Sequence, residues 1–236
     1  MVWSVLGGCL LVGCVGHRAM FVVQVDAKLE YKPDPPALKY VLLPAEMGQE
    51  QNDDSQFRVV AGYVERALQR AGYESAGCAY GERHCKAAEL AIFVEFEQVG
   101  TRQPYVFYEP ACAAPLYTWD PNLYGRGQGG SRRVGPMCRP IGYFEYQGGY
   151  VEYHTRLTLS ALDLVRERAA ESPRRPWRTE MVVEGFIHEL DRLVPALLAA
   201  GGAYFGSDSG ANLKVRIHEQ DERVCRIAQR ACDSDE

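Results

Sequence analysis

Two kinds of hydrophobic periodicity alternate along this chain of 236 residues and predict the order of its elements. Apolar residues at every second position predict half-buried strands over residues 21–31, 90–97, 150–164 and 177–183. Two further strands are predicted over residues 37–43, where Pro44 ends the strand, and 213–217. Apolar residues at helical spacing predict a helix that begins near Asp54 or Ser55 and stops at Gly72. A second helix is predicted over residues 187–198, where Pro195 is expected to kink or restart it because proline has no N–H to donate.

The order of these elements predicts the fold class. Helices spaced between alternating strands predict an α+β fold, a two-layer sandwich with a mixed, mostly antiparallel sheet and two main helices on one face. Residues 165–175 are expected to form a charged hairpin loop. We expect a single domain over residues 21–218, followed by a charged C-terminal tail over residues 219–236.

Residues 99–148 show neither period, and we interpret them as a long loop insertion in the domain. The segment is rich in Gly, Pro, Tyr and Arg. Tyr, Trp and Arg are the residue types enriched at the energetic centres of protein interfaces. We therefore predict a partner-binding surface over residues 102–146, with Trp119, Tyr124 and Arg126 near its centre. The alternative is that these aromatic residues pack the loop onto its own domain.

The N-terminal run is apolar over residues 1–16 and ends at His17. About 20 apolar residues are needed to span a bilayer, so a run this short is typical of the hydrophobic region of a secretory signal. The sequence Leu-Val-Gly-Cys that ends at Cys14 resembles the lipobox of bacterial lipoproteins. The resemblance implies a signal peptide over residues 1–13, a lipid of the palmitate type on Cys14, and a tether over residues 14–20.

One feature departs from this pattern, because signal peptides normally open with Lys or Arg and this run has neither. Either the true start lies upstream or the signal is weak. A buried N-terminal strand with Cys14 as an ordinary cysteine is the alternative. By analogy with lipoprotein sorting, Val15 stands where an Asp often retains proteins at the inner membrane. We therefore expect a cell-envelope protein anchored in the outer membrane and facing the periplasm.

Several short motifs lie in the predicted strands and at the end of the first helix: Tyr40–Pro44, Val64–Tyr73, Ala91–Phe96, Leu157–Asp163 and Pro176–Arg178. Together with the lipobox, these motifs resemble an uncharacterised bacterial lipoprotein family that is catalogued as a domain of unknown function. The resemblance covers residues 20–218 and implies an envelope lipoprotein without a known active site. The insertion at 99–148 and its cysteines depart from the compact pattern of the family.

Cysteine count supports an exported protein with disulfide bonds. Six cysteines remain when Cys9 and Cys14 are set aside, and an even number in an exported chain favours disulfides. The pairs that we expect from their spacing are Cys112–Cys138 and Cys78–Cys85. If the C-terminal segment is helical, Cys225 and Cys232 lie about 10 Å apart, farther than a disulfide permits, and they pair only if the segment unwinds.

Two short segments match cofactor or metal motifs, but each lacks the neighbouring elements or ligands that such a site needs. Gly125–Gly130 satisfies the pattern G-x-G-x-x-G, but no predicted strand precedes it and no helix follows it. Cys78, His84 and Cys85 offer three zinc ligands where a structural site needs four, so a disulfide is favoured. We predict no cofactor and no metal.

Two further patterns are weak signals of catalysis. Gly206–Gly210 is similar to a serine-protease loop, but neither His154 nor His188 has a neighbour that would make it a base, so we predict a turn. Glu95 and Glu97 share one strand face and could serve in acid–base chemistry. Alternation on an exposed strand face accounts for them without chemistry.

These observations predict a non-enzymatic, lipid-anchored envelope protein that binds a protein partner in envelope assembly or maintenance. The net charge of −5 gives no general attraction to nucleic acid, and no nucleic-acid partner is expected. The alternatives are an auxiliary lipoprotein subunit of a lipid or solute transport system, and a hydrolase. A cleft that brings His154 or His188 together with carboxylates would favour the hydrolase.

Overall fold

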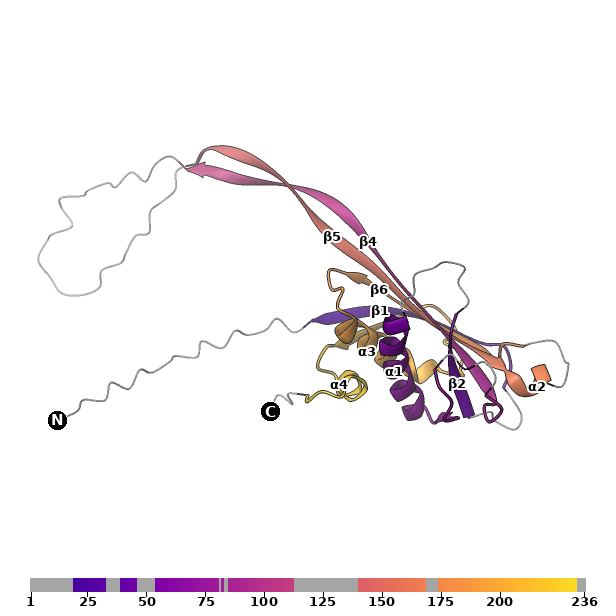
Figure 1. Ribbon diagram of the computed structural model, residues 1–236. Helices are drawn as coiled ribbons and strands as arrows, with labels where there is room; N and C mark the ends of the chain where they lie inside the picture. The colour runs from indigo at the N-terminus through magenta and orange to yellow at the C-terminus, as the bar shows by residue number, and fades with distance from the viewer. Residues whose placement is uncertain are drawn as a thin grey trace, which may run out of the picture. The chain divides into compact units, whose positions relative to one another are not determined.

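A computed structural model of the protein (Figure 1) describes residues 19–32, 39–45, 54–80, 82, 85–112, 140–168 and 174–232. Within these residues the fold is α+β, with a seven-stranded mixed sheet and four α-helices. The strands are β1 (Met20–Leu29), β2 (Lys39–Pro44), β3 (Glu74–Ser75), β4 (Leu90–Cys112), β5 (Pro140–Asp163), β6 (Trp177–Gly185) and β7 (Leu213–His218). The helices are α1 (Asp54–Arg70), α2 (Leu164–Arg168), α3 (Leu190–Gly201) and α4 (Glu222–Ala228), with a 3₁₀ turn, η2, at Gly202–Tyr204.

The strand order in the sheet is β3-β2-β4-β5-β6-β1-β7. Strand β2 pairs in parallel with β3 and β4, whereas β6 pairs antiparallel with β5 and β1, and β1 antiparallel with β7. The connection between β2 and β4 contains α1, as a parallel pair requires a crossover. The α+β class and the mixed sheet predicted from the sequence are confirmed.

The main core joins the sheet to α1, α3 and α4 in one cluster of buried side chains. Helix α3 contacts β1, β6 and β7, and α1 contacts α3, α4 and β2. Helix α1 ends before Gly72, whose φ of +91° lies in the left-handed region that favours glycine. Helix α3 continues through Pro195, so it does not restart there. Every residue of α3 from Leu193 to Gly201 is buried, and this packing holds the helix despite the hydrogen bond that proline removes.

Strands β4 and β5 are much longer than the sequence predicts. Strand β4 continues beyond residue 97 to Cys112, and β5 begins at Pro140 instead of residue 150. Residues 100–152 form a second compact unit of the chain. The loop interpretation is therefore wrong for the described parts of the segment. Side chains are exposed on both faces of these strand regions, so no alternation of apolar and polar residues marks them.

Two smaller differences concern helices. Helix α2 covers the last residue of the predicted strand and the first four of the predicted charged loop. Asp163 Oδ1 accepts hydrogen bonds from the backbone N–H groups of Val165 and Arg166. Helix α4 lies within the segment predicted as a charged tail. Its apolar residues, Val224 among them, are buried against the main core. Both helices are too short for a helical period to stand out in the sequence.

Candidate functional site: an aromatic ribbon

The most unusual surface lies on the second unit of the chain. We call residues 100–112 of β4 and 140–152 of β5 the aromatic ribbon. Nine of the sixteen large apolar side chains that are exposed among the described residues belong to it: Tyr105, Val106, Phe107, Tyr108, Tyr143, Phe144, Tyr146, Tyr150 and Val151. An apolar surface of this density on a soluble protein usually marks an interaction site.

Aromatic rings on the ribbon stack in a continuous series. The ring centroids of Tyr105 and Tyr150 are 6.1 Å apart, those of Tyr105 and Phe107 are 5.8 Å apart, and those of Phe107 and Tyr146 are 5.1 Å apart. Their planes are inclined by 30° or less, so the ring faces cover one another. Each of these side chains is still more than 40% exposed.

Gly148 is part of this arrangement. A Cβ atom at this position would lie 2.5 Å from Cζ of Tyr105 and 2.7 Å from its hydroxyl oxygen. The tyrosine ring thus covers the bare backbone of the glycine, a pairing that stabilises glycine in strands. Sequence reasoning missed both Gly148 and Tyr150 because it assigned residue 148 to the loop and residue 150 to the buried sheet. The fixed two-residue spacing of Tyr146, Gly148 and Tyr150 was the available signal.

The ribbon carries little charge where its side chains are described. Arg102, Glu145 and Glu152 are the charged residues between positions 100–108 and 143–152. The surface therefore lacks the basic character needed to attract nucleic acid or anionic lipid headgroups. A nearly uncharged surface rich in exposed tyrosine and phenylalanine has the composition of a protein interface.

Most of the predicted site residues lie outside the described part of the chain. This applies to Cys14, to Trp119, Tyr124 and Arg126, and to Cys138. Cys112 is the last residue of β4. Lipidation at Cys14, the Cys112–Cys138 bond and the three central binding residues therefore stay predictions.

Two disulfide bonds are present among the described residues. Cys78 and Cys85 are bonded, with their Cα atoms 6.0 Å apart. Cys225 and Cys232 are also bonded, with their Cα atoms 5.7 Å apart. The second bond forms because α4 ends at Ala228 and Gln229 adopts a left-handed conformation (φ 56°), which turns the chain back toward the helix. The sequence analysis allowed this bond only if the C-terminal segment unwinds, and the chain is indeed no longer helical after Ala228.

The carboxylates that were considered for acid–base chemistry form ion pairs instead. Arg156 Nη2 on β5 lies 3.4 Å from Glu95 Oε1 and also donates to Glu97 Oε2, both on β4. One guanidinium group thus bridges two like charges on one face of the sheet. Such a bridge is typical of a structural charge cluster.

The two candidate histidines do not share a site. His154 Nδ1 lies 3.2 Å from Glu184 Oε1, and both side chains are at least half exposed. His188 stacks on Tyr153, with the ring centroids 5.2 Å apart. The Gly206–Gly210 segment is a turn, as predicted, with both glycines at positive φ. The Ser209 hydroxyl accepts from the N–H of Ala27 and donates to the carbonyl of Ala211, so it holds the turn on β1.

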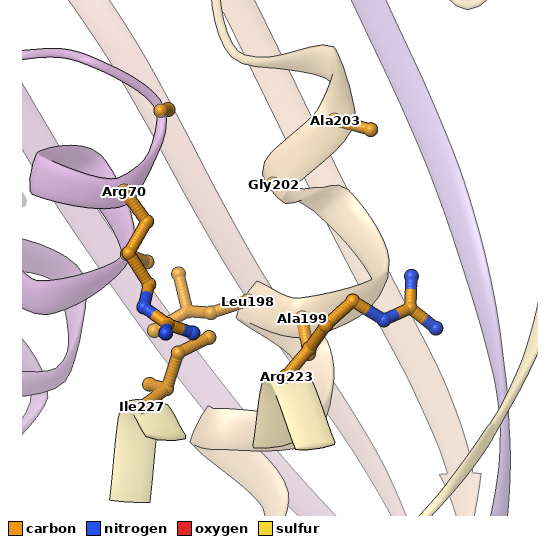
Figure 2. Close-up of a pocket in the computed structure, with 9 residues that line it drawn as sticks. Arg70, Leu198, Ala199, Gly202, Ala203, Arg223 and Ile227 are labelled. Atoms are coloured by element: carbon orange, nitrogen blue, oxygen red, sulfur yellow. The ribbon is translucent and has the colours of Figure 1, made fainter. Parts of the chain in front are cut away.

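Cavities in the first unit offer weaker candidates. The cavity in Figure 2 measures about 250 Å³ and lies between α1, α3 and α4, with small apolar residues such as Ala199 and Ala203 along its wall. The guanidinium groups of Arg70 and Arg223 point in different directions there (Figure 2). The Arg223 guanidinium donates two hydrogen bonds to the carboxylate of Asp221. A larger groove of about 510 Å³ has a mixed lining that includes Phe93, Glu95 and Arg175. Neither cavity brings together groups of matched chemistry.

Comparison with known proteins adds no assignment, since no family model, no curated protein and no solved structure matches the chain. Among the described residues, no helix is long and apolar enough to cross a membrane. The described part of the chain also contains no group of three or more His, Cys, Asp or Glu side chains placed to hold a metal ion.

Proposed function

We propose that this protein is a lipid-anchored envelope lipoprotein that binds a protein partner through the aromatic ribbon, in envelope assembly or maintenance. The observation that carries the proposal is the concentration of exposed, mutually stacked aromatic side chains on residues 100–152. Burying aromatic side chains contributes strongly to the free energy of association. The anchor at Cys14 would hold this surface at the outer membrane, facing the periplasm.

The two-layer arrangement predicted from the sequence belongs to the same proposal. We infer that α1 and α3 cover one face of the sheet, because both helices share the main core with Val25, Leu157 and Met181. The other face carries charged side chains, among them those bridged by Arg156. In this arrangement the globular unit is a scaffold, and binding is assigned to the ribbon.

The binding part is tested by photo-crosslinking in cells that make the full chain. A photoreactive phenylalanine derivative replaces Tyr108 or Tyr143, which are 64% and 68% exposed. The same substitution at Val59 on α1, which is 49% exposed, is the matched control. We expect the two ribbon positions to capture one and the same envelope protein and the control to capture none.

A loss-of-binding variant completes this test. With the photoreactive residue kept at Tyr108, replacing Tyr143 and Phe144 with serine should abolish the capture and lower the melting temperature by no more than a few degrees, because both side chains are exposed. Equal capture at Val59 and at the ribbon, or capture at Tyr108 that survives the double substitution, would contradict the assignment of binding to the ribbon.

The anchor is tested separately with the substitution Cys14→Ala. The variant should lose metabolic labelling by a palmitate analogue and should accumulate as an unprocessed or soluble form. Labelling that persists in the variant would refute lipidation at Cys14 but would leave the binding surface untouched. The two parts of the proposal can therefore fail independently.

A further inference from the structure

A group of exposed apolar side chains lies where the chain enters the sheet. Met20 and Val22 on the outer face of β1 are 64% and 46% exposed, and Phe186, just after β6, is 64% exposed. The three side chains also line one cavity of about 230 Å³. One acidic residue, Glu184, belongs to the same lining, and its Oε1 atom lies 3.2 Å from Nδ1 of His154. The apolar side chains therefore form one surface, and such a surface usually marks an interaction site.

Basic side chains lie beside this surface on β7. In the antiparallel pairing of β1 with β7, Arg216 lies opposite Val22 and Lys214 lies opposite Gln24. Residues directly opposite each other point to the same face of a sheet, so both basic side chains share the face of Val22. Both are exposed, and the residues opposite them on β1 carry no charge.

At the other end of the same face, basic side chains stand beside carboxylates. Lys28 lies opposite Arg178 in the pairing of β1 with β6. Lys28 Nζ is 3.7 Å from Asp26 Oδ2, and Arg178 Nη2 is 2.8 Å from Glu180 Oε2. The positive charge of this face is thus neutralised locally at that end, whereas it adjoins apolar side chains at the end that carries Val22.

The predicted lipid anchor is close to this surface along the chain. Met20 follows Cys14 by six residues, and an extended chain spans at most about 3.6 Å per residue. The start of β1 therefore lies within about 22 Å of the cysteine that would carry the lipid. A short tether holds the surface at a high local concentration near the headgroups, so weak contacts suffice for docking.

We propose that the β1–β7 surface, formed by Met20, Val22, Phe186, Lys214 and Arg216, docks on the lipid bilayer in which the protein is anchored. The inference rests on the anchor proposed above at Cys14. The apolar side chains enter the headgroup region, and the two cations meet anionic headgroups. Apolar side chains combined with Lys and Arg on one face are typical of surfaces that bind anionic membranes. Protein binding stays with the aromatic ribbon.

Fluorescence quenching in vesicles tests the contact with the full-length, acylated protein. A fluorescent amino acid replaces Val22, and the vesicles contain phosphatidylcholine and phosphatidylglycerol. Some of the vesicles also contain a lipid with a spin-label quencher near its headgroup. We expect quenching at position 22. Val59 on α1 is the matched control, because it is similarly exposed (49%) but belongs to a helix that packs on the main core, and it should not be quenched.

Removal of the two cations supplies the second measurement. Lys214→Gln combined with Arg216→Gln should lower the ratio of docked to undocked protein about twenty-fivefold, since each basic residue near an anionic surface contributes about fivefold. Vesicles of phosphatidylcholine alone should lower the ratio for the same reason. Lys28→Gln combined with Arg178→Gln removes two cations from the other end of the face and should change the ratio much less, because both stand beside carboxylates.

The outcomes separate this inference from the proposed anchor. Acylated protein that floats with the vesicles but shows no quenching at position 22 would overturn the inference alone. Equal quenching at positions 22 and 59, or quenching that is insensitive to both cations and to anionic lipid, would do the same. A change in emission at position 22 that needs no quencher and depends on protein concentration would mean that protein covers the surface, against the inference. A chain that is not acylated at Cys14 would overturn the anchor and the inference together.

Discussion

Glu219 connects three separate segments of the protein, and its replacement by glutamine is the sharpest test of how the C-terminal segment is held. Arg192 on α3 donates from Nε and Nη2 to the two carboxylate oxygens, at 2.9 and 2.7 Å. Arg230 donates from Nη2 to the backbone carbonyl of Glu219 at 2.7 Å. The N–H of Glu219 donates to the carbonyl of Ala19 beside β1. Glu219→Gln keeps the shape of the side chain and removes its charge.

The expected cost follows from the geometry and exposure of the Arg192–Glu219 pair. The Glu219 side chain is 16% exposed and that of Arg192 30%, so solvent screens the pair only in part. A hydrogen bond to a charged group contributes about 1.5–3 kcal/mol, and glutamine can accept only one of the two bonds from Arg192. We expect a loss of about 2 kcal/mol in the free energy of unfolding. For a chain of this size that loss lowers the melting temperature by about 4–8 °C.

Urea unfolding without reductant, followed by circular dichroism, measures this loss. The matched control is Glu222→Gln on α4, whose partner is Arg226 four residues along the helix. Both of these side chains are more than half exposed, so this substitution should cost less than about 0.5 kcal/mol. The comparison separates a pair that joins distant segments from one that is local to a helix.

The pH dependence adds a second test. The hydrogen bonds from Arg192 hold the pKa of the Glu219 carboxyl below its ordinary value of 4.5. A depressed pKa in the folded state contributes stability that is fully present above the unfolded value and is lost as the pH falls through the folded value. The difference in stability between wild type and Glu219→Gln should therefore shrink as the pH falls below 4.5. A difference that stays constant down to acid pH, or equal losses for both glutamine variants, would refute the reasoning.

Two more predictions follow from the remaining contacts. Replacing both Cys225 and Cys232 with serine should lower the free energy of unfolding by about 2.5 kcal/mol, because the bond closes a short loop in the unfolded chain; an unchanged urea midpoint would contradict this. Burial, together with the hydrogen bond that the phenol donates to Asp163, raises the pKa of Tyr31 to about 12 from 10.0. The stability from this raised pKa is present below pH 10 and is lost as the pH rises toward 12, so Tyr31→Phe should make the protein less sensitive to alkali. Urea midpoints measured between pH 8 and pH 11, roughly the range around the tyrosine pKa, test this, with the exposed Tyr143→Phe as a control that should change nothing.

Local sequence pattern was sufficient where one face of an element is buried. Strand β1 shows this, since Val23 and Val25 are completely buried while Val22, the neighbour of Val23, is 46% exposed. Burial of one face selects apolar residues at every second position, and this selection is what the sequence records. The sequence also predicted where α1 ends, just before Gly72, because the left-handed conformation at that position favours glycine over any other residue.

The strands of the aromatic ribbon could not be predicted from local sequence pattern. The two faces of the ribbon are both exposed, so no selection for alternation operates and the strands look like loop in the sequence. The binding surface predicted from the sequence, residues 102–146, does include Tyr105, Phe107 and Tyr146. Sequence reasoning had no means of finding that their rings stack, because stacking across β4 and β5 depends on which residues of the two strands meet.

The sequence by itself thus determined the types of most elements, the α+β class and the chemical character of the insertion. Only the tertiary structure decided the strand order, the stacking around Gly148, the link from Glu219 to Arg192 and the bond between Cys225 and Cys232. The physical reason is the distance along the chain over which each kind of information acts. Periodicity and turn residues report the environment of a few neighbouring positions, whereas contacts between distant segments depend on register and packing that no local pattern contains.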